Sequence, residues 1–351
     1  MRKIRIIITE GVIMIIPILL FILGLILLIK GGDWFVDGAT GLARRFKLPE
    51  ILIGATVVSI GTTLPEVMVS SSAAIIGNGE IAYGNAIGSI ICNTALISAI
   101  TIAVSPSKID KKSLIIPVIF FFIAATFYSG ISYTTGNFKR WTGITLIALF
   151  IVYMVITVLK MLKNKTQDIQ EEKPEILDKL PFKQELVLEL KGERTSVVRE
   201  LILLVLGAVA IAFGADFLVE NGTKIATMLG VPDSVIALTF VALGTSLPEL
   251  VTAITSLVKG HGSLSLGNII GANLFNLVLV SGVSITISPF SIPAESILFG
   301  QNASLVLDIP VMLSVMLLLT VPTLITGKLK RWQGIVLLLI YASYCTIQFI
   351  M

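Results

Sequence analysis

The chain has 351 residues, of which 55% are hydrophobic and only 14% charged, with a formal net charge of +4. Soluble globular domains carry about 25% charged residues, so this composition excludes them and predicts an integral membrane protein. The basic residues lie between apolar runs and form no patch on a soluble face, which argues against nucleic-acid binding. Cys92 and Cys345 both fall in apolar runs, and neither a disulfide nor a metal-binding spacing is present.

Apolar segments long enough to cross a bilayer recur along the chain and predict an all-α fold. We expect ten transmembrane helices, at 11–35, 50–77, 82–104, 113–130, 141–160, 197–221, 232–258, 264–288, 306–326 and 332–350. The first run follows a basic N-terminus but has no small-residue cleavage site, so we interpret it as a retained span. Residues 161–196 mix Lys and Glu without apolar periodicity and predict a solvated connector. The predicted units are therefore a repeat at 1–160, the connector at 161–196 and a second repeat at 197–351.

The distribution of Lys and Arg predicts the orientation of the protein in the membrane. One side would carry 19 basic residues, in the loops at 36–50, 105–113, 160–199, 259–263 and 327–331. The opposite side, with both termini, would carry six. We therefore predict a multi-pass protein of a prokaryotic plasma (inner) membrane, with both termini outside and the connector cytoplasmic.

The two halves of the sequence repeat each other. Gly-Thr-Thr-Leu-Pro-Glu at 61–66 recurs as Gly-Thr-Ser-Leu-Pro-Glu at 244–249, a shift of 183 positions. The same shift carries Asp33 onto Asp216, near the ends of spans one and six, where structural pairing is the favoured interpretation. Five spans per repeat would make the second copy enter from the opposite face, and such inverted repeats place their binding site near the midplane.

Glu66 and Glu249 are the central candidates for function. Each lies roughly 20–25 Å into its predicted span, close to the bilayer centre. A carboxylate there marks a functional site by default, and spans two, three, seven and eight have no Lys or Arg in their interiors. Thr62 and Thr245 lie one helical turn earlier and share the face of each glutamate.

Pro65 and Pro248 precede the two glutamates. A proline inside a helix disturbs the carbonyl four residues earlier, here at Gly61 and Gly244, and freed carbonyls are tolerated in membranes where they line a cavity. Carboxylates, hydroxyls and carbonyls are hard oxygen ligands, which suit Na⁺ and Ca²⁺.

Spans three and eight add a polar stripe. Asn85, Ser89 and Asn93 are spaced by four residues, and their counterparts are Asn268, Ala272 and Asn276. Asn93 and Asn276 lie deepest and are the preferred ligands, with an interhelical hydrogen bond as the alternative for each asparagine.

The paired motifs, each followed after 17 residues by Gly-Asn-x-Ile-Gly, resemble the two alpha-repeats of the sodium/calcium exchangers, in the calcium/cation antiporter superfamily. The resemblance implies a secondary active antiporter that exchanges Na⁺ for Ca²⁺ by alternating access, with no cofactor and no obligatory protein partner. It also implies an ion site between spans two, three, seven and eight, at Thr62, Thr63, Glu66, Ser89, Asn93, Thr245, Ser246, Glu249 and Asn276.

Three details of the motifs bear on the coupling ion. The proton/calcium branch of the superfamily usually shows Gly-Asn before its glutamate, so Gly-Thr here favours sodium. Ala272 stands where the family often has a serine, which removes one hydroxyl from the implied site. Asn276 stands where potassium-dependent members carry an aspartate, which argues against potassium dependence.

Three other functions compete with this interpretation. A proton-coupled cation antiporter would have the same fold. A cation channel could also place two glutamates at the midplane, although inverted repeats with broken helices favour a carrier. An intramembrane enzyme is disfavoured because the sole histidine, His261, lies in a loop and no Ser–His pair occurs in the spans.

Overall fold

The computed structural model describes residues 2–46, 48–106, 108–171, 184–229, 244–294 and 297–350. Within these residues the chain is helical apart from two short antiparallel strand pairs. The long uninterrupted helices are α1 (Arg2–Arg45), α6 (Lys111–Thr134), α7 (Arg140–Glu171), α8 (Gln184–Met228), α11 (Leu247–Val258) and α15 (Arg331–Ile350). The strands are β1 (Asn137–Phe138), β2 (Phe290–Ser291), β3 (Ile297–Leu298) and β4 (Gln301–Asn302), paired β1–β2 and β3–β4.

Four further helical runs of the described chain contain a short π-helical turn. They are α2 (Glu50–Ile53), η1 (Gly54–Val58) and α3 (Ser59–Ile75); α4 (Gly79–Cys92), η2 (Asn93–Ser98) and α5 (Ala99–Val104); α12 (Gly262–Phe275), η4 (Asn276–Val280) and α13 (Ser281–Ile287); and η5 (Ser304–Asp308) with α14 (Ile309–Thr326). A π turn frees backbone carbonyls, and buried ones need partners. Tyr153 Oη donates to Ala55 O at 2.7 Å, and Ser281 Oγ donates to Asn276 O at 3.0 Å.

Eight helical runs within the described residues are long and apolar enough to span a bilayer. They are Ile15–Arg45, Glu50–Ile75, Gly79–Val104, Lys111–Thr134, Arg140–Lys160, Val197–Met228, Gly262–Ile287 and Ser304–Thr326. The predicted all-helical membrane fold is thus confirmed. The predicted span 232–258 is represented by α11, since 232–243 lie outside the described residues. The predicted span 332–350 corresponds to α15, which is not among these eight runs. The count of ten transmembrane helices therefore stays a prediction.

The helix boundaries differ from the predicted spans chiefly at the two ends of α8, which runs to Met228 and not to 221, and at the ends of α1 and α7. We expected the first span to end near residue 35, but α1 continues to Arg45. Nothing in its polar second half breaks a helix until Pro49, which disfavours helical geometry at the residue before it. Similarly, α7 reaches Glu171 and α8 begins at Gln184, so helix extends into both ends of the range assigned to the connector.

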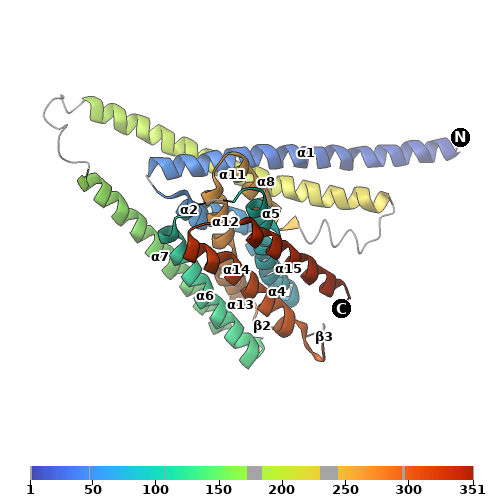
Figure 1. The fold of residues 1–351 in the computed structure, drawn as a ribbon. Helices are drawn as coiled ribbons and strands as arrows, with labels where there is room; N and C mark the ends of the chain where they lie inside the picture. Colours follow the sequence, from blue (N-terminus) through green and yellow to red (C-terminus); the bar gives the residue numbers. More distant parts are fainter. Residues whose placement is uncertain are drawn as a thin grey trace.

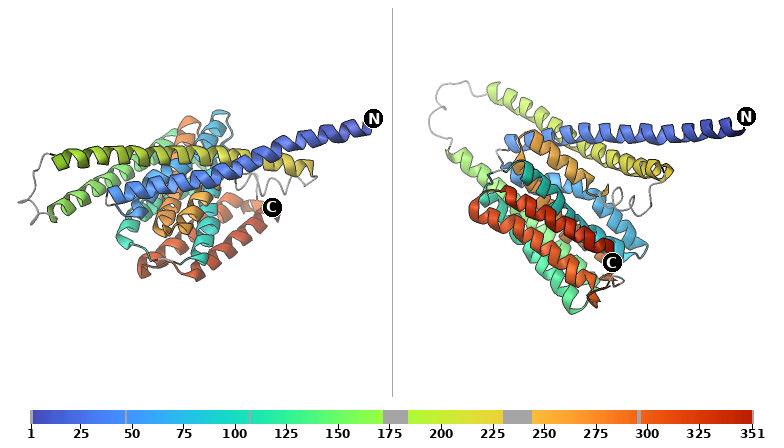
Figure 2. Two further views of the ribbon diagram at one scale, coloured as in Figure 1. Left: turned by 90° about the horizontal axis from the view of Figure 1, so that it is seen from above. Right: turned by 45° about the vertical axis from the view of Figure 1, so that its right-hand side comes forward.

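Helices α1 and α8 lie side by side across one side of the other helices (Figures 1 and 2). Glycines allow their backbones to touch: an added Cβ would lie 2.8 Å from Gly214 O at Gly24 and 2.6 Å from Glu200 O at Gly38. The contacts run in opposite directions along the two sequences, so the pair is antiparallel. Such small-residue contacts are typical of membrane helices, whose association depends on close packing.

The remaining helices form the core of the bundle. One close contact between small residues occurs in it twice. Gly143 of α7 packs against Gly282 of α13, where an added Cβ would lie 2.6 Å from Gly282 O. Gly334 of α15 packs against Ala99 of α5, with the corresponding distance to Ala99 O being 2.5 Å. Ala99 and Gly282 are related by the 183-residue shift, and Gly143 and Gly334 occupy matching positions after the repeated Lys-Arg-Trp.

The loops gather at two opposite ends of the bundle. At one end, Ile109 N donates to Gly327 O at 2.9 Å, and Lys259 Nζ contacts Asp37 Oδ1 at 2.8 Å. His261 Nδ1 lies 2.8 Å from Glu50 Oε1 at the same end. These contacts join the loops at 36–50, 105–113, 259–263 and 327–331, which the distribution of Lys and Arg assigned to one side of the membrane. Asp33 also pairs with Lys259, at 3.3 Å, as the structural interpretation predicted.

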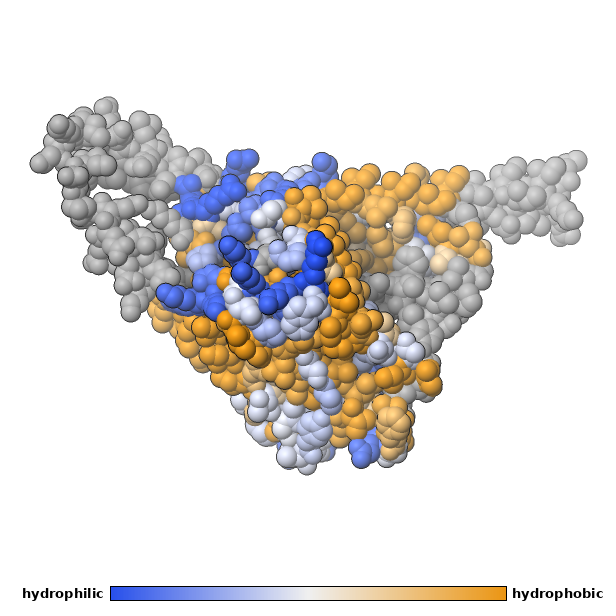
Figure 3. Space-filling view, viewed as in Figure 1, coloured by the Kyte–Doolittle hydropathy of each residue, from blue (hydrophilic) through white to orange (hydrophobic). Residues whose placement is uncertain are grey.

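The opposite end is built around the β1–β2 pair. Arg140 Nε donates to Thr286 O at 3.0 Å, and Tyr133 Oη donates to Leu305 O at 2.6 Å. Between the two ends the surface is largely apolar (Figure 3), with exposed aliphatic side chains such as Ile15 and Leu159. Contiguous apolar surface of this extent belongs in a bilayer, not in water.

The glycine contacts between α1 and α8 predict that Gly207→Ala destabilises the protein. An added Cβ would lie 2.5 Å from Phe35 N, a backbone atom that cannot rotate away. Overpacking of this kind costs about 1–3 kcal/mol, so the melting temperature in detergent should fall. Gly130→Ala in α6 is the control, because no described atom lies within 4 Å of its added Cβ. Equal melting temperatures for the two variants would contradict the packing argument.

Candidate functional site

Glu66 and Glu249 meet inside the bundle from sequence positions that are far apart. Glu66 lies in α3 and Glu249 in the first turn of α11, and both side chains are 0% exposed. Their carboxyl groups are close enough to interact with each other, and the Thr62 side chain also approaches Glu249. None of these contacts has the geometry of a full hydrogen bond, and all four carboxyl oxygens lack a partner among the described residues.

Within the described residues, no basic side chain pairs with the two carboxylates. The ion pairs in the described part of the chain all lie elsewhere, at Lys224, Lys259 and His261. A buried carboxylate pair without a basic partner needs another source of positive charge, because desolvation of each ion costs several kcal/mol. In the described ranges no group of three His, Cys, Asp or Glu side chains converges, so any cation here would be bound by two carboxylates and neutral oxygens.

The two motif prolines occupy different helical positions. Pro65 lies inside α3, as predicted. Pro248 instead lies in the first turn of α11, after Ser246 at the N-cap, so the prediction of a mid-helix proline is wrong there. In a first turn the missing N–H of proline costs nothing, and the unpaired N–H groups of that turn attract negative charge. The Glu249 carboxylate therefore lies at the favourable end of a helix dipole.

The four asparagines of the polar stripe divide into two pairs. Asn85 Nδ2 donates to Glu66 O at 3.2 Å and to Ser70 Oγ at 2.8 Å, which ties α4 to α3. Asn268 Oδ1 accepts from Thr62 Oγ1 at 3.1 Å, which ties α12 to α3. For these two asparagines the interhelical hydrogen bond is the better interpretation.

Asn93 and Asn276, the preferred ligands, are different. Both are 0% exposed, and in the described structure neither the amide oxygen nor the amide nitrogen of either has a partner. Each begins a π-helical turn, η2 and η4 respectively. Polar amides left unpaired in a core are costly unless they bind something, and π turns are frequent at functional sites.

The predicted hydroxyl ligands surround the same region. Thr62 and Thr63 are buried in α3, and the Thr63 hydroxyl has no partner among the described residues. Ser89 is buried in α4. Ser246 is buried against Cys92, whereas Thr245 is half-buried at the edge of the described chain.

Helices α1 and α8 cover the site. A small cavity of about 10 Å³ separates Thr62, Pro65 and Pro248 from Phe35 of α1 and Ile211 of α8. Phe35 is fully buried, and an added Cβ at Gly61 would lie 3.0 Å from its ring. The α1–α8 pair is therefore the layer that closes the motif region laterally.

Thr252 is a residue that the sequence analysis missed. It lies one turn after Glu249 on α11, is 0% exposed, and its hydroxyl has no partner among the described residues. Its spacing from Glu249 could have identified it. Its counterpart in the first half is Val69, however, so the repeat gave no signal.

The fold and the site together define an integral membrane protein that buries two unpaired carboxyl groups, with hydroxyls and amides, inside a helix bundle. The family model described as sodium/calcium exchanger protein matches residues 16–159 and 199–350. The chain therefore belongs to the sodium/calcium exchanger family, whose members are cation/Ca²⁺ antiporters, and is a transporter.

Individual relatives agree with this assignment. An uncharacterized membrane protein of Methanocaldococcus jannaschii is 37% identical over 92% of this chain and 94% of its own length. The sodium/calcium exchanger MaX1 of Methanosarcina acetivorans is 30% identical over 94% of this chain and 98% of its own. The solved structure of the sodium-calcium exchanger NCX_Mj, soaked with Na⁺ and Sr²⁺, superimposes with a TM-score of 0.74 at 32% identity, over 95% of this chain and 99% of that one.

The two kinds of asparagine predict opposite effects of substitution. Asn268→Ala removes an oxygen that accepts from Thr62 Oγ1 at 3.1 Å and from Ser59 Oγ at 3.3 Å, and should lower stability by about 1–3 kcal/mol because these buried hydrogen bonds between helices are lost. Asn93→Ala removes an amide with no such bond and should leave stability unchanged while weakening Ca²⁺ binding. Thermal melting in detergent and calcium titration of the same samples measure both quantities. Asn93→Ala melting as low as Asn268→Ala would identify Asn93 as structural.

Proposed function

We propose that this protein is a secondary active antiporter that exchanges Na⁺ for Ca²⁺ by alternating access through the site between Glu66 and Glu249. The observation that carries the proposal is the pair of fully buried carboxylates, which come from distant parts of the chain and have no cationic partner among the described residues. Cations bound from outside are then the natural counter-charge.

The proposed architecture is ten transmembrane helices in two inverted five-helix repeats, at 1–160 and 197–351, joined by the connector 161–196. The duplicated contact of Gly143 with Gly282 and of Gly334 with Ala99 supports it, as does the antiparallel α1–α8 pair. The grouping of the basic loops at one end supports a cytoplasmic connector, with both termini outside a plasma membrane.

The proposed ligands supply only oxygen, from two carboxylates, several hydroxyls and two amides. They are Thr62, Thr63, Glu66, Ser89, Asn93, Thr245, Ser246, Glu249 and Asn276. Oxygen-only sites with flexible geometry suit Ca²⁺ and Na⁺ more than softer metals. Asn93 and Asn276 contribute no charge, so the site carries −2 when both glutamates are ionised.

That charge explains obligatory exchange. One Ca²⁺ or two Na⁺ neutralise the site, whereas an empty site would leave two carboxylates uncompensated in a low-dielectric interior at a cost of several kcal/mol. The loaded carrier can therefore switch between its two states and the empty one cannot. Because α1 and α8 cover the site and pack on each other as a unit, we infer that their movement changes access.

The motifs favour sodium as the coupling ion. Gly-Thr, not Gly-Asn, precedes the glutamate in both repeats. The relatives named as sodium/calcium exchangers, and the neighbour soaked with Na⁺ and Sr²⁺, support the same choice. A proton-coupled antiporter of the same fold is the competing outcome of the experiment below.

Proteoliposomes preloaded with Na⁺ should take up radioactive calcium, and vesicles preloaded with K⁺ or choline at the same pH should not. Glu66→Gln and Glu249→Gln should each abolish uptake, because each removes half of the charge that balances Ca²⁺. The matched control is Glu80→Gln, the same chemical change at an exposed position, which should retain uptake.

Two results would overturn parts of the proposal. Substantial uptake by either buried-site variant would contradict the carboxylate mechanism. Uptake that follows an imposed pH gradient and ignores internal Na⁺ would leave the fold and site intact but replace sodium by protons.

A further inference from the structure

Among the buried hydroxyls outside the proposed ligand set, three lie on the α11–α12 hairpin. They belong to Thr252 and Ser256 of α11 and to Ser265 of α12, and are at most 3% exposed. None of the three hydroxyl oxygens has a hydrogen-bond partner in the described part of the protein. Buried polar atoms without a protein partner are normally satisfied by water or a bound ion.

The hairpin between α11 and α12 brings Ser256 and Ser265 to its bend, and we call these two residues and Thr252 the hydroxyl column. His261 N donates to Ser256 O at 2.7 Å and Ser265 N donates to His261 O at 3.2 Å, so both serines lie one turn from the hairpin bend on facing helices. On α11, Ser256, Thr252 and Glu249 follow at helical spacing and share one face. The column therefore runs from the bend to the Glu249 carboxylate.

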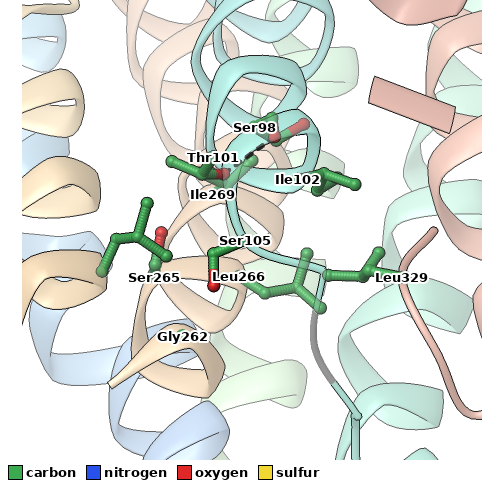
Figure 4. A pocket seen from close by; sticks show the side chains of 10 residues that line it. Ser98, Thr101, Ile102, Ser105, Gly262, Ser265, Leu266, Ile269 and Leu329 are labelled. Carbon is green, nitrogen blue, oxygen red and sulfur yellow. Dashed lines mark hydrogen bonds between the residues drawn. The ribbon is translucent and has the colours of Figure 1, made fainter. Parts of the chain in front are cut away.

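A small cavity lies at the outer end of this column (Figure 4). Its volume is about 10 Å³, room for roughly one water molecule. The hydroxyl-bearing residues Ser98, Ser105 and Ser265 line it, and Ser105 is exposed at the end of the molecule that carries Lys259 and His261. Thr101 Oγ1 donates to Ser98 O at 2.8 Å within the same wall.

An apolar cluster closes the cavity toward the exchange site. Ile269 lines the cavity and packs in a buried cluster with Ile97 and Ala253. Ile97 follows Asn93 by one turn, and Ala253 follows Glu249 by one turn. The cluster therefore lies between the cavity and the proposed ligands.

The column is confined to the second half of the chain. Under the 183-residue shift, Thr252, Ser256 and Ser265 correspond to Val69, Ala73 and Ala82, none of which carries a hydroxyl. Helix packing in the repeat therefore does not require hydroxyls at these positions. A role on one side of the membrane accounts for the difference between the halves.

We propose that this hydroxyl column, with the cavity at Ser105, is the route by which cations pass between Glu249 and the end of the molecule that bears Lys259 and His261. The proposal rests on the proposed function and deepens it by assigning the inner access path. Neutral hydroxyls can replace the water ligands of Na⁺ or Ca²⁺ one at a time, and without a carboxylate they do not trap the ion.

Cysteine accessibility tests the route. Ser265→Cys is reconstituted in the full chain and treated with a small charged thiol reagent, with adducts assigned by peptide mass spectrometry, which separates them from native Cys92 and Cys345. The control is Ala82→Cys, the matching position in the first half, which is also buried. We expect Ser265→Cys to be labelled at least about tenfold faster, because a hydrated path opens more readily than apolar packing. Labelling should occur when the reagent is on the side of the 259–263 loop.

Equal labelling rates in the two variants, or labelling of Ser265→Cys only from the opposite side, would overturn the route. If Ser265→Cys fails to fold, Ser256→Cys with Ala73→Cys as its control tests the same column. Labelling does not depend on which ion drives transport. Failure of the wild-type protein to exchange Na⁺ for Ca²⁺ would therefore contradict the proposed function. The labelling result would still decide whether the route exists.

Discussion

The burial of two carboxylates side by side in an apolar bundle is the constraint on which the rest of this structure depends. Desolvation and mutual repulsion both oppose it, and no basic side chain of the described chain relieves them. The surroundings of Glu66 and Glu249 respond to this constraint in two ways. Glu249 lies in the first turn of α11, where the helix dipole favours negative charge, and buried hydroxyls and amides accompany the two glutamates.

The two types of helix contact in the bundle have different consequences. Near the site, Asn85 and Asn268 tie neighbouring helices with directional hydrogen bonds, so the ligand-bearing backbone is held in one position. Helices α1 and α8 meet through glycines and aliphatic side chains, which permit close approach of the two backbones. A carrier with a fixed binding site is expected to combine a rigid centre with helices that can move against it, and the α1–α8 pair fits the second role.

Much of this arrangement could be predicted from the sequence because the repeat reports on it twice. The shift of 183 positions identified Glu66 with Glu249 and Asn93 with Asn276, and helical spacing placed each on a buried face. Three features were missed: one is shared by both halves, because α1 and α8 end at the matching positions Arg45 and Met228, and two occur in the second half only. Helix α1 extends to Arg45 because its polar stretch contains no proline, whereas hydropathy predicts only where the apolar span ends. The first-turn position of Pro248 and the unpaired hydroxyl of Thr252 depend on where α11 begins and what faces it. These last two features occur in one half only, so the repeat carries no information about them.

The exchange of packing partners between the two halves has a consequence for biosynthesis. Gly143 packs on Gly282, Ala99 on Gly334, and α1 on α8, so each half completes the core of the other. The first half leaves the ribosome without the surfaces that it will finally contact. Translation proceeds at about 5–20 residues per second, so about 9–37 seconds separate the synthesis of α1 from that of its partner helix. During this interval lipid must solvate helix faces that the finished protein buries.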